Sequence, residues 1–262
     1  MSVKLSIVFT LVLAGAVAAH HSGGMPQERA KSGERVPVIV ELFTSEGCSS
    51  CPPADEALRR LASTQPVPGV VIVAMSEHVD YWNSLGWTDP FSSAQFNQRQ
   101  DEYAKAFGLD GIYTPQMVVD GREEFVGNDV GKAAQAISRV AGAPKRPFQL
   151  AATKVNADTV RLQVQIEPAP NGGSEDVYLA VTEDNLSSNV KRGENEGRVL
   201  AHTAVVRRLS LIGNIDRRNG FHSEPVIRLD RRWKPAELLF LIFVQDRKSR
   251  RILAAQSARA PQ

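Results

Sequence analysis

The sequence is poor in cysteine, in net charge and in long apolar stretches, and each shortage excludes a class of protein. Two cysteines are too few for a small secreted domain stapled by several disulfides. A formal net charge of +2 is too small to indicate nucleic acid or an anionic membrane as a partner. Beyond the first residues, no segment is long and apolar enough to span a membrane.

The N-terminus has the pattern of a cleaved secretory signal. Lys4 is followed by an apolar run from Leu5 to Ala18 and by the small residues Ala16-Val17-Ala18-Ala19. A positive start, an apolar middle and an A-x-A ending are typical of a signal peptide, here residues 1–19. The alternative is an N-terminal membrane anchor, for which the run is short. We therefore expect export to the periplasm or the extracellular space, with residues 20–34 as a flexible N-terminal segment.

Residues 35–143 alternate between strand-like and helix-like patterns. Apolar, β-branched runs at 36–44 and 70–75 suit buried strands, and residues 54–62 place alanines and leucines on one helical face. A helix pattern at 90–107, strands at 116–119 and 124–126, and a helix ending near residue 140 follow. The order βαβαββα predicts a mixed sheet with helices on both faces, an α/β domain.

After the Pro-rich, basic linker 144–149 the pattern changes to strands alone. Residues 159–166 alternate strictly between apolar and polar, and further strand patterns follow at 177–182, 199–209, 225–229 and 238–244. Turn sequences such as NGG and RRNG separate them. Spaced strands with turn signals predict an all-β sandwich domain over residues 150–262.

Both cysteines, Cys48 and Cys51, lie between the first strand pattern and the first helix pattern. Pro52 and Pro53 fit the first turn of a helix, where N–H groups have no intrahelical partner. Residues three apart on a helix are close enough for a disulfide. Because a helix N-terminus favours a thiolate, we expect an ionised, reachable Cys48 sulfur and a shielded resolving sulfur on Cys51.

Two further features bear on this pair. Thr114-Pro115 directly precedes a short buried strand, a position that suits a cis proline whose bend brings Thr114 beside the cysteines. Glu41 interrupts the apolar run VIVEL. A buried carboxylate is costly unless it accepts a proton or is paired, so Glu41 is a candidate catalytic acid. The alternative for Glu41 is an outward-facing strand residue.

The sequence resembles a known family. Residues 36–143 are similar to the thioredoxin-like superfamily, and ELFTSEGCSSCPPAD, SEHVDYWNSLGWTDPF and YTPQMVVDG resemble the secreted, thioredoxin-like family called domain of unknown function 1223. The resemblance implies that Cys48 is the nucleophile, Cys51 the resolving cysteine and Pro115 the cis-proline. It places Glu41 near the buried acid of thioredoxins, one residue further from the first cysteine.

The segment after the second strand carries His78, Tyr81, Trp82 and Trp87. Ligand sites of open α/β sheets lie beyond the carboxyl ends of strands, the edge that also holds Cys48. These side chains are therefore candidates for binding a polypeptide substrate. The alternatives are a local core that packs the long loop and, for His78, an ordinary hydrogen-bonded histidine.

Three functions remain open from the sequence. The first is an exported thiol–disulfide oxidoreductase that acts on protein thiols and disulfides with an unidentified redox partner and no cofactor besides its own cysteines. The second is copper binding or delivery by Cys48, Cys51 and His78, since two thiolates and an imidazole suit copper(I). The third is a non-catalytic binding module whose disulfide stays closed.

Overall fold

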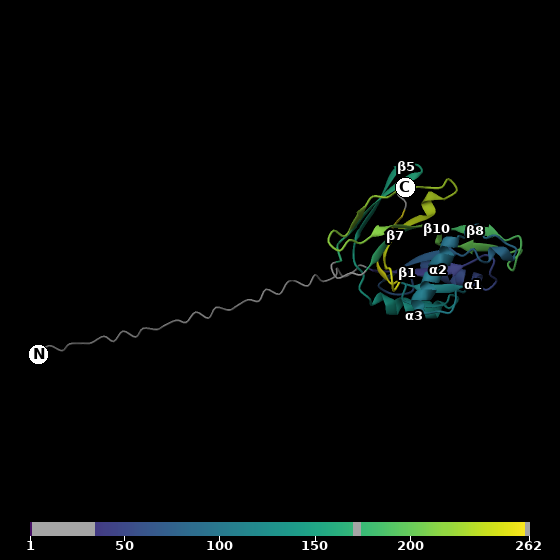
Figure 1. Ribbon diagram of the computed structural model, residues 1–262, viewed down its shortest axis with the longest axis horizontal. Helices are drawn as coiled ribbons and strands as arrows, with labels where there is room; N and C mark the ends of the chain where they lie inside the picture. The colour runs from purple at the N-terminus through teal and green to yellow at the C-terminus, as the bar shows by residue number, and fades with distance from the viewer. Residues whose placement is uncertain (2–34, 170–173, 260–262) are drawn as a thin grey trace. The chain divides into compact units, whose positions relative to one another are not determined.

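The computed structural model describes Met1 and residues 35–169 and 174–259, and Arg35–Gln262 forms one compact unit (Figure 1). Apart from Met1, the predicted signal peptide and N-terminal segment lie outside the described residues. Within the part of the chain described, no helix is long and apolar enough to cross a membrane.

The first half has the predicted element order. Its elements are β1 (Val36–Thr44), α1 (Pro52–Thr64), β2 (Val70–His78), a 3-10 turn η1 (Asn83–Leu85), α2 (Ala94–Phe107), β3 (Gln116–Val119), β4 (Glu123–Val126) and α3 (Val130–Ala141). Ser93 caps α2 and Asp129 caps α3, because each side chain accepts a hydrogen bond from a main-chain N–H of the first turn. The second helix therefore begins after Ser93, a few residues later than the sequence predicts.

The second half is built of strands, as expected. They are β5 (Gln149–Asn156), β6 (Thr159–Ile166), β7 (Glu175–Glu183), β8 (Leu186–Asn189), β9 (Val199–His202), β10 (Val205–Asn214), β11 (Phe221–Ser223), β12 (Val226–Arg228), β13 (Leu238–Asp246) and β14 (Ile252–Arg259), with a 3-10 turn η2 (Pro235–Glu237). The run 199–209, predicted as one strand, is broken at Ala204, which has φ 50°.

One sheet runs through both halves, which corrects the prediction of a separate sandwich. Its eight strands follow the order β14-β13-β7-β10-β2-β1-β3-β4, with β1 parallel to β2 and antiparallel to β3. The halves join where β10 pairs parallel to β2 at Val205 and Ser76. A smaller antiparallel sheet holds β5, β6, β11 and β12. The fold is thus a mixed α/β fold. Of the two sheets formed by the strands of the predicted sandwich, the larger one also contains the strands of the first half.

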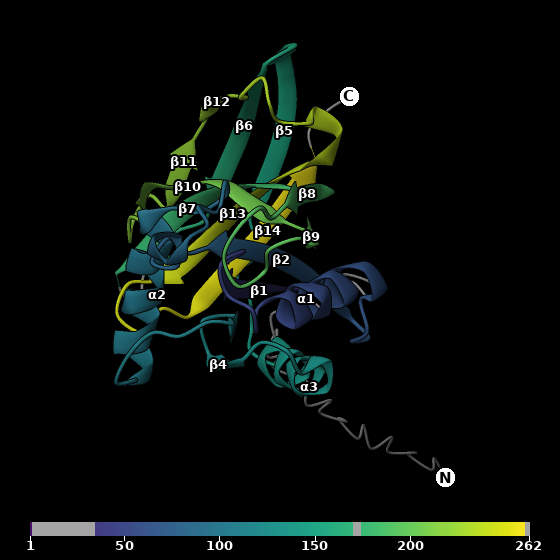
Figure 2. The same ribbon diagram turned by 90° about the vertical axis from the view of Figure 1, so that its right-hand side faces the viewer.

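The two faces of the large sheet are covered differently (Figure 2). Leu42 and the other even-numbered apolar residues of β1 pack against α1 and α3, and Phe240 and alternate residues of β13 pack against the small sheet. Ile39, Phe43 and Phe243 face α2 on the opposite side. Because strand side chains alternate between faces, alternate residues of β1 and of β13 contribute to hydrophobic cores on opposite faces of the large sheet.

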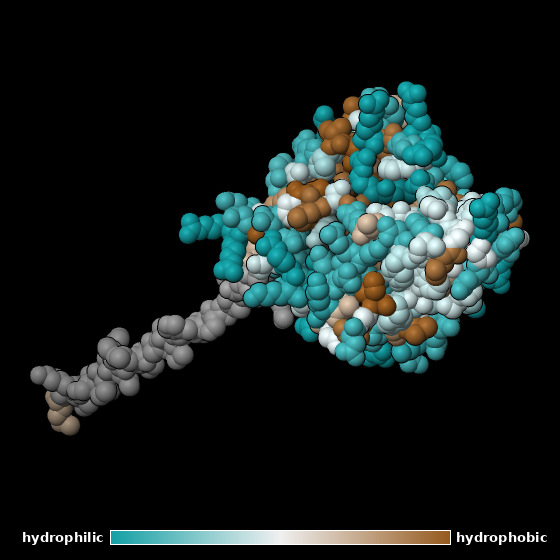
Figure 3. All heavy atoms as spheres, turned by 45° about the vertical axis from the view of Figure 1, so that its right-hand side comes forward, coloured by the Kyte–Doolittle hydropathy of each residue, from teal (hydrophilic) through white to brown (hydrophobic). Residues whose placement is uncertain are grey.

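Hydrophilic residues dominate the face seen in Figure 3, with hydrophobic residues in separate patches. A few large apolar side chains in the described residues are exposed, among them Leu85 and Val199. Single exposed apolar residues are normal on a protein surface.

A hairpin of the second half lies beside the cysteines. It consists of β8, β9 and the turn between them, residues 186–202, and we call it the cover hairpin. Its turn is held by main-chain hydrogen bonds from Val190 N to Arg198 O (3.0 Å) and from Gly197 N to Val190 O (3.0 Å). Gly193 has φ 79°, and a Cβ there would lie 3.3 Å from Trp87 Cβ, so the turn packs closely on the aromatic segment after β2.

Candidate functional site

Cys48 and Cys51 form a disulfide at the start of α1, with 5.4 Å between their Cα atoms. β1 ends at Thr44, and the chain then turns through a main-chain hydrogen bond from Cys48 N to Ser45 O (3.2 Å). Cys51 directly precedes the helix, and its carbonyl accepts from Ala54 N at 2.8 Å. The pair thus lies at the helix N-terminus, as the sequence predicts.

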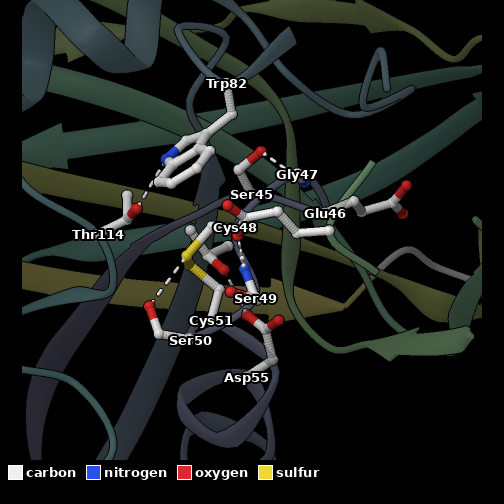
Figure 4. Close-up of a disulfide and its surroundings, with 12 residues drawn as sticks. Ser45, Glu46, Gly47, Cys48, Ser49, Ser50, Cys51, Asp55, Trp82 and Thr114 are labelled. Atoms are coloured by element: carbon white, nitrogen blue, oxygen red, sulfur yellow. Dashed lines mark hydrogen bonds between the residues drawn. A yellow bond between two sulfur atoms is a disulfide. The ribbon is translucent and has the colours of Figure 1, made fainter. Parts of the chain in front are cut away.

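Thr114 and Pro115 lie beside this disulfide. Their peptide bond is cis, as predicted. β3 pairs with β1, with Gln116 opposite Phe43, which places the Thr114-Pro115 step next to the end of β1. Figure 4 shows Thr114 near the disulfide, with its Oγ1 accepting a 2.9 Å hydrogen bond from Trp82 Nε1.

Both cysteines are fully buried, which differs from the reachable Cys48 sulfur that the sequence predicts. Only Ser49 and Ser50, between them, are exposed. Trp82 lies over the loop that carries the cysteines, since a Cβ on Gly47 would be 3.0 Å from Trp82 Cβ.

The cover hairpin provides the rest of the covering. The side-chain amide of Asn195, itself fully buried, donates to the main-chain oxygens of Glu46 (2.9 Å) and Cys48 (3.0 Å). The exposed carboxylate of Glu194 accepts from Ser49 N at 2.9 Å. These contacts satisfy the hydrogen-bonding main-chain groups of the cysteine loop. In their absence the same groups would be free to bond with another molecule.

A cluster of acids and histidines lies behind the cysteines, and we call it the His–acid cluster. Its members are Glu46, His78, Asp89 and His202, which are buried, and Asp55, which is half-buried. His78 Nδ1 lies 2.7 Å from Asp89 Oδ2, and His202 Nε2 lies 2.9 Å from Glu46 Oε1. The two rings are edge to face, with 4.9 Å between their centroids. Three segments far apart in the sequence therefore meet beneath the start of α1.

Asp55 connects this cluster to the helix that carries Cys51. Its Oδ1 accepts from Thr44 Oγ1 at 2.8 Å. Burial raises the pKa of Asp55 to about 6, although the nearby His78 and His202 act in the opposite direction. Burial alone would lower the pKa of His78, but the Asp89 carboxylate holds it above its ordinary value.

Glu41, predicted as a catalytic acid, is not brought to the cysteines. It faces α2, on the side of the sheet opposite α1, where Arg99 Nε donates to its Oε2 at 2.6 Å and Tyr103 donates to its Oε1. Arg99 also donates to Gln245 of β13 at 3.1 Å. Glu41 is fully buried and paired, and its network joins the two halves of the chain.

The predicted substrate-binding residues divide into two sets. Tyr81, Trp82 and Trp87 are half-buried along the edge of the covered cysteines, and Trp87 Nε1 donates to Glu46 at 2.7 Å. His78 is fully buried and belongs to the His–acid cluster.

The copper ligands of the alternative hypothesis are not assembled, because Cys48 and Cys51 are joined to each other and His78 pairs with Asp89. In the described residues no group of three or more His, Cys, Asp or Glu side chains could hold a metal ion.

Sequence reasoning missed Glu46, Asp55, Asp89, Asn195 and His202 as members of the site. One signal was present for Asp55, since it follows Cys51 by four positions and so shares its helical face. The others approach the cysteines only through long-range contacts, for which this sequence offers no pattern.

A buried CxxC disulfide at a helix start, beside a cis proline, gives the first half the look of a thioredoxin-like fold. The chain belongs to the family described as protein of unknown function DUF1223, whose model matches residues 39–245.

Two solved structures resemble it. Protein AGR_C_4864 from Agrobacterium tumefaciens is 29% identical, with a TM-score of 0.66 over 87% of this chain and 96% of that one. HBP35 of Porphyromonas gingivalis is 19% identical, with a TM-score of 0.62 over 86% of this chain and 75% of that one, and supports the fold alone. No curated protein matches the sequence.

Proposed function

We propose that this chain is an exported thiol–disulfide oxidoreductase with a thioredoxin-like first half, whose CxxC disulfide is covered in the oxidised form. The observation that carries the proposal is the Cys48–Cys51 disulfide at the start of α1, directly beside cis Thr114-Pro115. The position gives Cys48 the positive dipole end of α1 and a 3.3 Å contact between its sulfur and Ser50 Oγ, and both favour a thiolate.

The reaction is an exchange of disulfides with a substrate dithiol. A substrate thiolate attacks the Cys48 sulfur, the Cys48–Cys51 bond breaks, and Cys51 leaves as a thiolate. The second substrate thiol then attacks the substrate sulfur of the mixed disulfide and releases Cys48. Two electrons pass from the substrate to the protein, and reduction of a substrate disulfide runs the same steps backward.

Burial of both sulfurs requires an opening step before the attack. The contacts to be broken are the hydrogen bond from Trp82 to Thr114 and the two hydrogen bonds from Asn195. Coverings of this kind, built from loops and hairpins, open on microsecond to millisecond timescales in many enzymes. Tyr81, Trp82 and Trp87 then line the mouth that a polypeptide substrate reaches.

A trapping experiment tests the proposal. In a Cys51→Ala variant Cys48 can attack a substrate disulfide but Cys51 is missing for the resolving step, so we expect substrate proteins to accumulate on Cys48 when the variant is expressed in its native compartment. The Cys48→Ala variant keeps one cysteine in the same loop and is the matched control. Absence of trapped protein, together with absence of turnover on a model disulfide, would contradict the proposal.

Burial of the disulfide favours a second candidate, a binding module whose disulfide never opens. A structural disulfide has a reduction potential below about −300 mV, whereas catalytic ones are less negative. Equilibration with glutathione redox buffers separates the two candidates. A bond that resists reduction in the folded protein supports the binding module.

Export is the proposed location, supported by Lys4, the apolar run that follows it and the small residues at 16–19. Mass spectrometry of the protein recovered from cells tests it. A mature chain beginning at residue 19 or 20 is expected, and a chain that keeps the apolar run contradicts cleavage.

A further inference from the structure

The burial of the disulfide creates a need for protons inside the protein. Reducing a disulfide to two thiols takes up two protons with two electrons. Both sulfurs are fully buried, so the leaving sulfur of Cys51 faces side chains instead of bulk water. A proton donor must therefore lie within the fold on the side of Cys51, or the thiolate would remain buried without a partner.

Asp55 is the ionisable side chain placed for this task. Its main-chain N donates to Cys51 O at 3.1 Å, and a spacing of four puts both side chains on one face of the helix start. Figure 4 shows Asp55 beside Cys51 at the first turn of α1. Glu56, the next residue, is exposed and paired with Arg59 on the other side.

Two buried histidine nitrogens near Asp55 lack a hydrogen-bond partner among the described residues. Because a carboxylate only accepts hydrogen bonds, the neutral rings carry their protons on His78 Nδ1, toward Asp89, and on His202 Nε2, toward Glu46. The other nitrogens, His78 Nε2 and His202 Nδ1, are buried and have no hydrogen-bond partner among the described residues. Each is a free base in the protein interior, and an unpartnered buried polar atom is costly unless it has a use.

We propose that Asp55, His78 and His202 form a proton reservoir beneath the start of α1 that serves Cys51 during disulfide exchange. The inference rests on the proposed function and assigns new residues to it. The reservoir takes one member from each of α1, β2 and the cover hairpin.

The proton steps balance in both directions. When a substrate thiolate attacks Cys48, Cys51 leaves as a thiolate and takes a proton from the Asp55 carboxylic acid. The Asp55 carboxylate regains a proton from His78 in the molecules whose ring is doubly protonated, a form that the Asp89 carboxylate favours, and the ring returns to its neutral form. In the reverse direction Cys51 gives its S–H proton to the Asp55 carboxylate as its sulfur attacks the mixed disulfide, and the substrate leaves as a thiolate.

The charges around the reservoir allow it to hold a proton near neutral pH. Asp89 faces His78, Glu46 faces His202, and Thr44 donates to Asp55. The Asp89 carboxylate favours a protonated His78 ring, and both rings favour an ionised Asp55. Burial opposes all of these charges and raises the pKa of Asp55 to about 6, a value from which a carboxyl exchanges protons readily.

A pH-jump experiment on the whole protein tests the reservoir. The reduced protein is converted at pH 4 to the mixed disulfide between Cys48 and thionitrobenzoate. The pH is then raised, and Cys51 expels thionitrobenzoate in a step that absorbance follows. We expect Asp55→Asn to slow this release about 10- to 100-fold. It should also move the pH midpoint of the rate toward that of an unassisted thiol, about 8.5.

The matched control is Glu56→Gln, which removes a carboxylate from the neighbouring position of the same helix turn and should leave the release unchanged. His78→Gln and His202→Gln, which keep a hydrogen-bonding group, should each shift the pH midpoint while the adduct still forms. Equal release rates and midpoints in the Asp55→Asn and Glu56→Gln variants overturn the role of Asp55. Unchanged midpoints in both histidine variants overturn the role of the histidines. Failure of the wild-type protein to form the adduct contradicts the proposed function as a whole.

Discussion

Asn195 donates a 3.0 Å hydrogen bond from its side chain to the main-chain oxygen of Cys48, across 147 positions of sequence. The same amide reaches the oxygen of Glu46, so one fully buried side chain holds the cover hairpin onto the cysteine loop. The second half of the chain therefore contributes to the covering of the disulfide.

Replacing Asn195 with alanine should loosen the cover. The change removes a donor from two buried carbonyl oxygens, of which Cys48 O still accepts from Cys51 N at 3.2 Å, at a cost of about 1–3 kcal/mol in the closed form. We expect reduction of the disulfide by dithiothreitol to become about 5- to 150-fold faster, since each 1.4 kcal/mol corresponds to a factor of ten. Asn189→Ala, at an exposed position of β8 in the same hairpin, is the control and should reduce at the wild-type rate. Equal rates in the two variants would show that the hairpin does not limit access.

The hydrogen bond between Trp82 and Thr114 is the second closing contact, and a double-mutant cycle measures it. Trp82→Phe keeps an aromatic ring and Thr114→Val keeps the side-chain shape, and each should cost about 1 kcal/mol in the free energy of unfolding. Because both remove the same bond, the double variant should cost less than the sum of the two. Urea unfolding gives the three values. Strict additivity would mean that the two side chains are not coupled.

Glu41 offers a test that separates stability from chemistry. Glu41→Ala removes the nearer carboxylate of buried Arg99, which keeps Glu77 Oε1 at 3.3 Å, and should lower the free energy of unfolding by about 1–3 kcal/mol. The reaction of the reduced cysteines with a thiol reagent should remain unchanged in the fraction that stays folded, since Glu41 faces α2. Urea unfolding and thiol-reaction rates measure the two quantities. A slower thiol reaction with normal stability would restore Glu41 to the catalytic role that its sequence position predicts.

Asp55 should make the stability of the protein depend on pH in the acid range. Burial raises the pKa of Asp55 to about 6, from an ordinary value of 3.8. The fold therefore favours the protonated acid, and this contribution is fully present below pH 3.8 and is lost as the pH rises through 6. The stability of Asp55→Asn relative to the wild-type protein should thus increase between pH 4 and pH 7. Denaturant titrations at several pH values measure this difference.

Glu56→Gln is the comparison for this titration. Its hydrogen bond to Arg59 lowers the pKa of Glu56, so its contribution has the opposite sign and is lost as the pH falls. A flat difference between Asp55→Asn and the wild-type protein across this range would contradict the burial of the Asp55 charge.

The sequence predicts well those parts of the fold that depend on local pattern. The buried run at β1 and the prolines after Cys51 each act on neighbouring residues, and each is found where expected. The pairing of β10 with β2 could not be predicted, because it joins Val205 to Ser76 through a single ladder position.

The residues of the site likewise divide into those that local sequence predicts and those that depend on long-range contacts. Cys48, Cys51 and cis Pro115 follow from short motifs. The burial of the sulfurs does not, because Asn195 and His202 come from residues more than 140 positions away. Glu41 was misleading because an acid in an apolar run has two explanations, and its pairing with Arg99 of α2 depends on which face of the strand it occupies.

The order of the elements along the chain has a consequence for how the protein is made. Ribosomes release Cys48 and Cys51 long before they synthesise Asn195, which holds the covering segment in place. During that interval an external oxidant or an isomerase can reach both sulfurs of the nascent polypeptide, and the disulfide is enclosed only once translation has passed β9.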